Sequence, residues 1–360
     1  MKIVKVNLKE NAYNIYIKYH LFKDIANYIK SLNIGNFAYI LTSKKIYDLY
    51  RNEIIEAFRS IQYKIIKVAD GEKAKSKYWL FYIIDFLSKN EKLNKKIYII
   101  CLGGGSIGDL GGLVASIYKR GIPYIQIPTT LLSQIDASIG GKTAINLKYA
   151  KNILGTFYQP KAVFIDPAFL QTLKKDQLKE GISEAIKYAV IKNKKLFNFL
   201  FKNYQKILSL IPVYIVKLIS ECVKIKAKII ELDEKEKKGI RTILNFGHTF
   251  AHALESSFSY KKISHGKAVA IGMVFATKLS YILNKCPLNT LKQLLDIIKI
   301  YGLPTKMKFN VTNVYKSLVY YDKKFISGNI RMVLIKEIGK VQIVEDISPA
   351  KIKKCLRDFC

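Results

Sequence analysis

The chain has 360 residues, which is more than one hydrophobic core usually supports, because cores tend to split beyond roughly 250 residues. We therefore expect two domains. Half of the residues are hydrophobic, which excludes a disordered chain.

The net charge of +34 would suit a nucleic-acid-binding protein. Only six of the 61 basic residues are arginine, however, and the lysines are spread over the whole length, so we interpret them as solvated surface residues and expect no nucleic-acid partner.

Hydrophobic runs and cysteines indicate the compartment. The sequence has no run of 18 apolar residues without a charge, and residues 1–18 alternate like a strand, so neither a membrane span nor a secretory signal is expected. The cysteines are odd in number, far apart and without a C-x-x-C pair, which predicts reduced thiols in a cytoplasmic protein. They are Cys101, Cys222, Cys286, Cys355 and Cys360.

Strands and helices alternate in the first part of the chain. Alternating apolar residues predict paired strands at 2–8 and 14–19. Apolar runs predict buried strands at 37–43, 63–69, 96–102 and 122–128, and helical spacing predicts helices at 44–59, 74–90 and 109–118. This order is typical of an α/β domain in which helices cover a sheet.

Helical spacing dominates the rest of the chain. Helices are predicted at 180–191, 211–236, 241–258, 265–284 and 290–302, followed by a strand pair at 329–339 and 340–346. We therefore predict an α/β N-terminal domain over residues 1–176 and a mainly α-helical domain over residues 177–360.

Glycine is concentrated in one segment. Ten of the twenty glycines lie between residues 103 and 155, which predicts a loop-rich region. Gly103–Gly108 fits G-x-G-x-x-G after a predicted strand, where backbone N–H groups can bind a phosphate, although a purely structural turn fits as well. No acidic residue lies between Asp109 and Asp136, so the usual ribose-binding carboxylate is missing and the string DGEKAK at 70–75 is a candidate replacement.

Three of the four histidines lie close together in the sequence, at His248, His252 and His265. His248 and His252 are four residues apart, which places both rings on one helical face, where they could bind a metal. The sequence lacks the glutamate of H-E-x-x-H, and core or capping histidines explain the spacing equally well.

Charged residues in apolar surroundings are further candidates. Glu184 shares a helical face with Lys187 and Tyr188, which suggests a ligand or a charge network, whereas a surface glutamate is the simpler alternative. Cations near glycines or helix ends suit phosphate and carboxylate groups. They are Lys142, Lys151, Lys226, Arg241 and Lys323. Arg120 and Arg241 indicate more than any lysine does, because arginine is scarce here and its planar fork suits oxyanions.

Taken together, the motifs resemble those of one family, the 3-dehydroquinate synthases. The matching strings run in order over nearly the whole chain, and the one at 128–146 is long and specific. They are DGEKAK (70–75), GGGSIGDLGG (103–112), YKRG (118–121), PTTLLSQIDASIGGKTAIN (128–146), KNILGTFYQP (151–160), ISEAIKYAVI (182–191), DEKE (233–236), RTILNFGHTFAHALE (241–255), HGKAVAIGM (265–273), and DKK with a later RMVL (322–334).

The resemblance implies an N-terminal domain that binds NAD, a C-terminal domain that binds a divalent metal, usually Zn²⁺ and possibly Co²⁺, and an active site in the cleft between them. It implies that Glu184, His248 and His265 are the metal ligands. Three protein ligands leave room for substrate oxygens, as a catalytic metal site requires. His252, which spacing alone groups with His248, is matched instead to a catalytic position.

The implied reaction converts 3-deoxy-D-arabino-heptulosonate 7-phosphate to 3-dehydroquinate and phosphate, in the shikimate route to aromatic amino acids. A hydroxyl is oxidised, phosphate is eliminated, the ketone is reduced again, and the ring opens and closes as an aldol, so that NAD is regenerated. The substrate phosphate can itself serve as the base for elimination.

The resemblance also implies roles for individual residues. The NAD contacts would be Asp70, Gly71, Glu72, Lys73, Lys75, Gly104, Gly105, Ser106, Ile107, Gly108, Asp109, Thr129, Thr130, Lys142, Lys151, Phe169 and Thr172. The catalytic residues would be Asp136, Lys142, Lys187, Asn245 and His252. The substrate contacts would be Arg120, Asn152, Lys226, Arg241 and Lys323. Arg120 matches a position that reaches the neighbouring subunit's site, so a homodimer is implied.

Two features depart from the family pattern. Lys267 follows His265-Gly266 where the family commonly has glutamate, which could alter support of the metal. At 322–324, either Lys323 or Lys324 could contact phosphate, and we favour Lys323.

Other functions remain to be weighed. A different sugar phosphate cyclase would share the metal, NAD and many of the motifs, but Arg241 and Lys226 provide the cations that a substrate carboxylate needs. A metal-dependent polyol dehydrogenase would release reduced cofactor. A nucleic-acid-binding protein is favoured only by the net charge.

Overall fold

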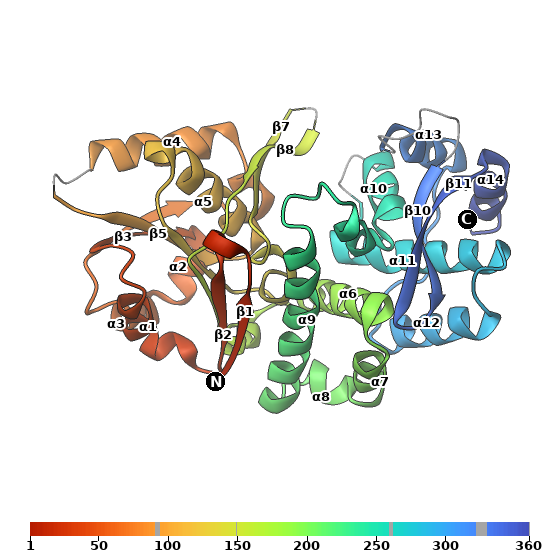
Figure 1. Cartoon of the computed structure of the whole chain (residues 1–360), viewed down its shortest axis with the longest axis horizontal. Coiled ribbons are helices and arrows are strands. Elements are labelled where there is room, and N and C mark those ends of the chain that lie inside the picture. The colour runs from red at the N-terminus through yellow and green to blue at the C-terminus, as the bar shows by residue number, and fades with distance from the viewer. Residues whose placement is uncertain (91–93, 149, 259–261, 322–329, 360) are drawn as a thin grey trace. The chain divides into compact units, whose positions relative to one another are not determined.

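The computed structural model describes residues 1–90, 94–148, 150–258, 262–321 and 330–359. The chain divides into two compact units (Figure 1). The first contains Met1–Leu173 and Lys226–Lys235, and the second contains Lys174–Ile225 and Glu236–Cys360. Within the part of the chain that the structure describes, no helix is long and apolar enough to cross a membrane.

A seven-stranded sheet forms the centre of the first unit, in the order β1-β2-β9-β6-β5-β3-β4. β1 and β2 are antiparallel, whereas all the other neighbours are parallel. The strands are β1 (Lys2–Val6), β2 (Tyr13–Ile17), β3 (Phe37–Ser43), β4 (Tyr63–Val68), β5 (Ile97–Gly103), β6 (Tyr124–Pro128) and β9 (Ala162–Ile165). Every residue of β3 and β5 is buried, as expected for parallel strands covered on both faces.

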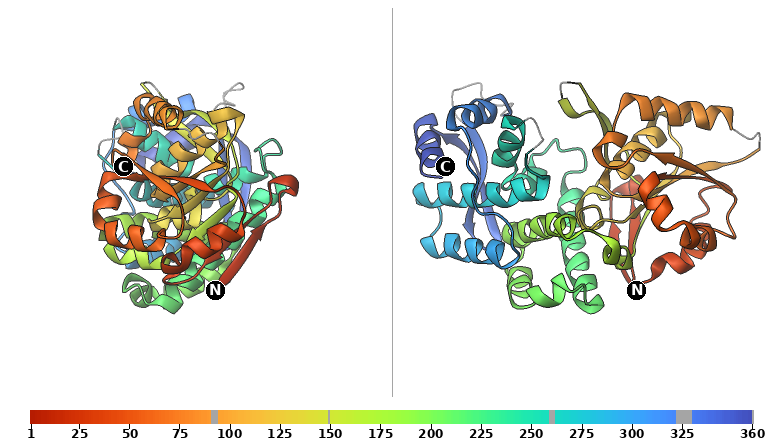
Figure 2. Two further views of the ribbon diagram at one scale, coloured as in Figure 1. Left: turned by 90° about the vertical axis from the view of Figure 1, so that its left-hand side faces the viewer. Right: turned by 180° about the vertical axis from the view of Figure 1, so that it is seen from behind.

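Helices cover both faces of this sheet (Figures 1 and 2). They are α1 (Ile25–Ser31), α2 (Lys44–Leu49), α3 (Arg51–Ala57), α4 (Lys77–Lys89) and α5 (Gly105–Ile117). Successive side chains of β3 enter opposite cores: Ile40 packs in one cluster with Ile25 of α1, and Tyr39 packs in the other with Ile83 of α4. The α/β class predicted for this part of the chain is confirmed.

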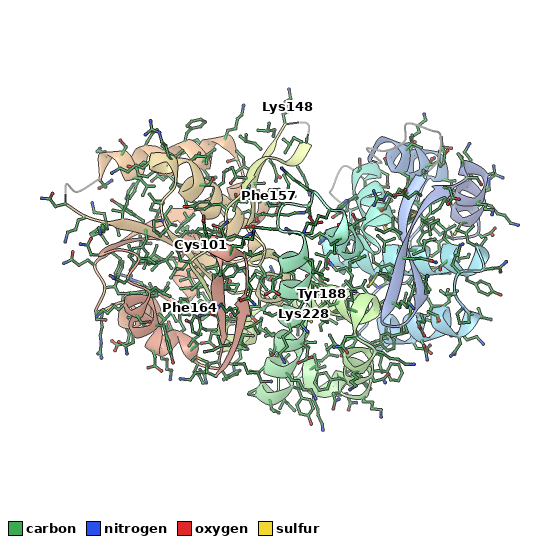
Figure 3. The ribbon with its side chains drawn as sticks, viewed as in Figure 1. Cys101, Lys148, Phe157, Phe164, Tyr188 and Lys228 are labelled. Atoms are coloured by element: carbon green, nitrogen blue, oxygen red, sulfur yellow. The ribbon has the colours of Figure 1, made fainter. Side chains whose placement is uncertain are left out.

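The glycine-rich segment contains more regular structure than its composition predicts. It forms α5, β6 and an antiparallel hairpin of β7 (Lys142–Leu147) and β8 (Ala150–Phe157), whose far end carries Lys148 (Figure 3). Several of the glycines permit close packing rather than loops. A Cβ at Gly111 of α5 would lie 2.3 Å from Cys101 Sγ, and one at Gly112 would lie 2.4 Å from a methyl of Thr143. The helix predicted at 109–118 and the strand predicted at 122–128 are confirmed, whereas the β7–β8 hairpin stands where a loop-rich stretch was expected.

The second unit is mainly helical, as predicted. Its helices are α6 (Lys175–Lys192), α7 (Lys194–Lys202), α8 (Tyr204–Leu208), α9 (Pro212–Leu232, which continues into the first unit), α10 (His248–Ser257), α11 (His265–Ile282), α12 (Leu288–Ile300), α13 (Val311–Tyr321) and α14 (Pro349–Arg357). The hairpin of β10 (Ile330–Glu337) and β11 (Lys340–Ile347) confirms the predicted strand pair. The helix predicted from residue 241 starts later, because a 3₁₀ helix at Ile240–Asn245 and Gly247, with φ +81°, precede α10.

Candidate functional site

Three helices of the second unit bring one carboxylate and two imidazoles together. Glu184 comes from the middle of α6, and His248 and His265 are the first residues of α10 and α11. The Nε2 atoms of both histidines lie 3.4 Å from Glu184 Oε1. One ligand atom from each of the three residues lies within 4.8 Å of the others. The residues that the resemblance implies as ligands are therefore neighbours in space.

The geometry of this cluster fits a divalent metal. In a tetrahedral site with bonds of about 2.0–2.1 Å, two ligand atoms lie about 3.3 Å apart, which is close to both observed N–O separations. Glu184 is fully buried, and its Oε1 faces both imidazoles without a hydrogen-bond partner. Two imidazoles and a carboxylate are also a donor set that suits Zn²⁺. The three residues thus have the chemistry and the spacing to hold such an ion.

Lys187 keeps Glu184 ionised. The Lys187 ammonium pairs with Glu184 Oε2 one helical turn away, and the Lys187 side chain is only 2% exposed. Burial by itself would raise the pKa of Glu184, but Lys187 and the two histidines outweigh burial and hold that pKa well below its usual range. Glu184 is therefore ionised, as a carboxylate must be to bind a metal.

The ring of each candidate ligand is oriented through its other nitrogen. His248 Nδ1 lies 3.3 Å from the carbonyl oxygen of Phe246, and His265 Nδ1 lies 3.4 Å from Glu255 Oε1. Sequence reasoning missed Glu255. The available signal was its position seven residues after His248, which puts both side chains on the same face of α10.

Close backbone contacts at glycines hold the three helices in place. A Cβ at Gly266, the second residue of α11, would lie 2.3 Å from the Cα of Glu180 in α6. A Cβ at Gly272 would lie 2.0 Å from the carbonyl oxygen of Gly247, directly before α10. Lys267 points elsewhere and pairs with Asp176 Oδ2 at 3.2 Å, with both side chains more than a third exposed.

The other candidates of the second unit lie on α10 and on the segment before it. The ring of His252 is centred 5.6 Å from that of His248 and 6.3 Å from that of His265. Arg241 is buried on the 3₁₀ helix that also carries Asn245, and its Nε lies 3.4 Å from Glu236 Oε1. Lys323 lies outside the described residues.

In the first unit, the glycine-rich turn lies beside the DGEKAK segment. Gly104 precedes α5, and Ser106 in its first turn donates a hydrogen bond to Glu72 Oε1 at 3.0 Å. Asn146 donates to Glu72 Oε2 at 2.8 Å. Burial would raise the pKa of Glu72, but Lys75 and these hydrogen bonds lower it overall, so Glu72 is ionised.

A surface cavity of about 670 Å³ adjoins this segment. Three candidate cofactor contacts, Asp70, Glu72 and Lys73, line it together with Lys44 and Trp79. Glu72 also accepts a hydrogen bond from Ser106 in the first turn of α5, although none of the residues that line the cavity belongs to α5. A helix N-terminus is in general suited to phosphate groups.

Lys75 connects two other candidate residues, Asp109 and Asn152. Its ammonium lies 2.5 Å from Asp109 Oδ2 and donates to Asn152 Oδ1, and its side chain is 4% exposed. Burial raises the pKa of Asp109, and Lys75 opposes that rise. Nearby in the same unit, Lys226 pairs with Asp136 Oδ1 and donates to the Asp136 carbonyl at 2.7 Å.

The remaining candidates of the first unit lie at strand ends and turns. Thr129 and Thr130 follow β6, and the Thr129 N–H donates to the Gly103 carbonyl at 2.9 Å. Thr172 and Tyr50 share a hydrogen bond between their hydroxyls, beside buried Phe169. The other residues lie on α5 or on the β7–β8 hairpin. These are Gly105, Ile107 and Gly108 on α5, and Lys142 and Lys151 on the hairpin.

Arg120 lies in a strained turn. Lys119 (φ +49°), Arg120 (φ +63°) and Gly121 (φ +126°) are consecutive residues with positive φ. For non-glycine residues this conformation costs free energy and is found where the surrounding structure demands it. The Tyr158 hydroxyl donates to the Ile122 carbonyl at 2.9 Å and helps to hold the turn.

Replacing Lys75 with methionine should destabilise the protein by about 3–5 kcal/mol at neutral pH, because Asp109 would lose its buried cation. Below about pH 4 the deficit should shrink, since Asp109 is then protonated in both the folded and the unfolded state. Urea denaturation at both pH values measures this, with Lys73→Met, at an exposed position of the same segment, as the control. Equal stability of Lys75→Met and the unchanged protein would contradict the assigned ion pair.

The sequence matches two family models, described as 3-dehydroquinate synthase N-terminal over residues 65–180 and 3-dehydroquinate synthase C-terminal over residues 181–325. It is 45% identical to the 3-dehydroquinate synthase of Dictyoglomus thermophilum, over 99% of this chain and 98% of that one. It is 42% identical to the 3-dehydroquinate synthase of Buchnera aphidicola subsp. Cinara cedri, over 96% of this chain and 95% of that one.

Solved structures show the same fold. The 2-epi-5-epi-valiolone synthase of Streptomyces hygroscopicus, with NAD⁺ and Zn²⁺ bound, aligns with a TM-score of 0.88 at 25% identity over 98% of both chains. A 2-deoxy-scyllo-inosose synthase complexed with carbaglucose-6-phosphate, NAD⁺ and Co²⁺ aligns with a TM-score of 0.90 at 23% identity over 100% of both chains. On the evidence of the family matches and full-length relatives, this chain belongs to the 3-dehydroquinate synthase family.

Proposed function

We propose that this protein is a 3-dehydroquinate synthase, a lyase that converts 3-deoxy-D-arabino-heptulosonate 7-phosphate to 3-dehydroquinate and phosphate. The observation that carries the proposal is the cluster of buried Glu184 with the partly buried His248 and His265, in a chain that matches its relatives over nearly their full length. The relatives named 3-dehydroquinate synthase are 38–45% identical, whereas the valiolone and inosose synthases are 23–25% identical. This difference supports the substrate of the dehydroquinate synthases over the substrates of the other two cyclases.

We propose NAD and a divalent metal, Zn²⁺ or Co²⁺, as the cofactors. Glu184, His248 and His265 would hold the metal, and the N-terminus of α5 with Glu72 and Lys75 would contact NAD. The chemistry that these groups supply when bound is polarisation of a substrate hydroxyl and transient storage of a hydride. The remaining NAD and substrate contacts implied by the resemblance stay proposals, including Lys323.

The side chains of the chain itself favour binding and orientation over proton abstraction. The candidate carboxylates Asp109, Asp136 and Glu184 each pair with a lysine, at Lys75, Lys226 and Lys187 respectively. Lys187 and the two histidines hold the pKa of Glu184 well below its usual range, so Glu184 is a weak base, whereas burial raises the pKa of Asp109 despite its pairing with Lys75. We propose, as the resemblance implies, that the substrate phosphate accepts the proton during elimination. Lys187, Asn245, Arg241 and His252 in the second unit, and Asp136, Lys142, Asn152 and Lys226 in the first, are proposed to orient the substrate.

We propose a homodimer that acts in the cytoplasm and has no nucleic-acid partner. All eight residues of β8 are exposed, and the second edge of β8 has no strand partner among the described residues. Ile153 is 59% exposed, Leu154 45% and Phe157 42%. An open, apolar strand edge favours association with another chain.

The direct test supplies the purified protein with the heptulosonate phosphate, NAD⁺ and Zn²⁺, and follows release of phosphate and appearance of dehydroquinate. We expect both products in equal amounts without accumulation of NADH, because NAD is regenerated. A chelator should abolish turnover and added Zn²⁺ should restore it. Net NADH formation would indicate a dehydrogenase, and no turnover with this substrate would overturn the proposal.

Glu184→Ala should lose metal and activity together, because two histidines alone bind Zn²⁺ weakly at a buried site. Metal content after dialysis should fall from one ion per chain to none, and turnover should fall to background. Glu221→Ala, which removes a partly exposed carboxylate of the same unit, should retain both. A Glu184→Ala protein that keeps a full metal content would exclude Glu184 as a ligand.

Arg120→Ala should raise the KM for the sugar phosphate roughly ten- to hundredfold while NAD⁺ affinity stays unchanged, since a hydrogen bond to a charged group contributes about 1.5–3 kcal/mol. Steady-state kinetics and NAD⁺ titration measure the two quantities, and Arg59→Ala at an exposed surface pair is the control. Sedimentation analysis of the same samples reports whether the protein is a dimer. An unchanged KM would remove the substrate role of Arg120.

A further inference from the structure

We propose that Glu255 is a positioning residue that fixes the ring of His265 for metal binding, a proposal that rests on the metal site described above. Glu255 Oε1 lies 3.4 Å from His265 Nδ1, and His265 Nε2 lies 3.4 Å from Glu184 Oε1. If Nδ1 donates its hydrogen to Glu255, the lone pair of Nε2 faces the cluster. The His265 ring therefore has Glu255 beside Nδ1 and Glu184 beside Nε2.

The position of Glu255 is unfavourable unless the side chain has such a role. Glu255 is 6% exposed, and burying a carboxylate costs free energy unless it has partners. It also lies in the last turn of α10, where the negative end of the helix dipole disfavours an acidic side chain. Contact with the imidazole of His265 offsets these costs.

The arrangement at His248 supports the same interpretation. His248 Nδ1 lies 3.3 Å from the Phe246 carbonyl, so both candidate histidine ligands have an acceptor beside Nδ1 and present Nε2 to Glu184. A carboxylate makes a metal-bound imidazole more basic than a carbonyl does. His265 is also the more exposed ligand, with 35% of its side chain accessible against 12% for His248, so its ring has more need of an external constraint.

A purely structural role is the competing explanation, because a carboxylate near the first turn of α11 would also stabilise that helix through its dipole. The two roles differ in what they predict. A structural carboxylate affects the folding of the metal-free protein whether or not His265 is present. A positioning carboxylate affects metal affinity, and only through His265.

The test measures Zn²⁺ and Co²⁺ affinity by competition with a chelator for Glu255→Leu and Glu255→Gln, in the unchanged chain and in His265→Ala. Glu255→Leu removes the acceptor and should weaken binding 10- to 100-fold. Glu255→Gln keeps an acceptor oxygen and should recover most of that loss. In the His265→Ala background, where the weaker binding is titrated directly with excess metal, Glu255→Leu should cause no further loss.

Control measurements separate this proposal from the proposed function. Glu221→Leu, at a half-exposed position of α9, should bind both metals as the unchanged protein does. Thermal unfolding without metal identifies variants that fail to fold. If Glu255→Leu fails to fold, the affinity of Glu255→Gln is used in its place. Glu255→Leu with unchanged affinity, or an equal loss in the His265→Ala background, would overturn the positioning role. Failure of the unchanged protein to bind any metal would instead overturn the proposed function.

Discussion

The ligand cluster depends on close contact between helix backbones. Glu184, His248 and His265 come from three helices, and ligand atoms must be placed to within about 0.5 Å for a metal to bind well. Gly266 lets α11 approach α6, and Gly272 lets α11 approach the start of α10. Any side chain at either glycine would separate the helices by more than the site tolerates. The two glycines have no side chain that could bind a metal, yet their close packing determines whether the three candidate ligands can do so.

Local patterns predicted most of the fold but only part of this site. Alternating and continuous apolar runs predicted the strands of the first unit, because residues along a strand are buried in a regular pattern that the sequence repeats. Spacing grouped His248 with His252, which are near in sequence, whereas the structure groups His248 with Glu184 and His265. Contacts between different helices leave no periodic signal in one sequence. The resemblance to a family supplied the candidate ligand set, and Glu255 was missed because no pattern in the sequence joins it to His265.

Glycine composition was ambiguous for a related reason. A glycine can serve a turn, as Gly247 does with its positive φ, or a close helix–strand contact, as Gly111 does against Cys101. The sequence shows where a glycine is, but it does not show whether that glycine forms a turn or permits a close contact. The hairpin of β7 and β8 was therefore not foreseen in the glycine-rich region, whereas the turn at Gly103–Gly105 does follow a buried strand and precede a helix, as predicted.

The path of the chain has a consequence for dissecting the protein. Because Lys226–Lys235 belongs to the first unit, the polypeptide leaves that unit after Leu173, returns at Lys226 and leaves again after Lys235. A fragment ending at Leu173 would lack Lys226, and Asp136 would lose the ammonium group with which it pairs. Cutting the chain at a single point therefore cannot separate the two units intact.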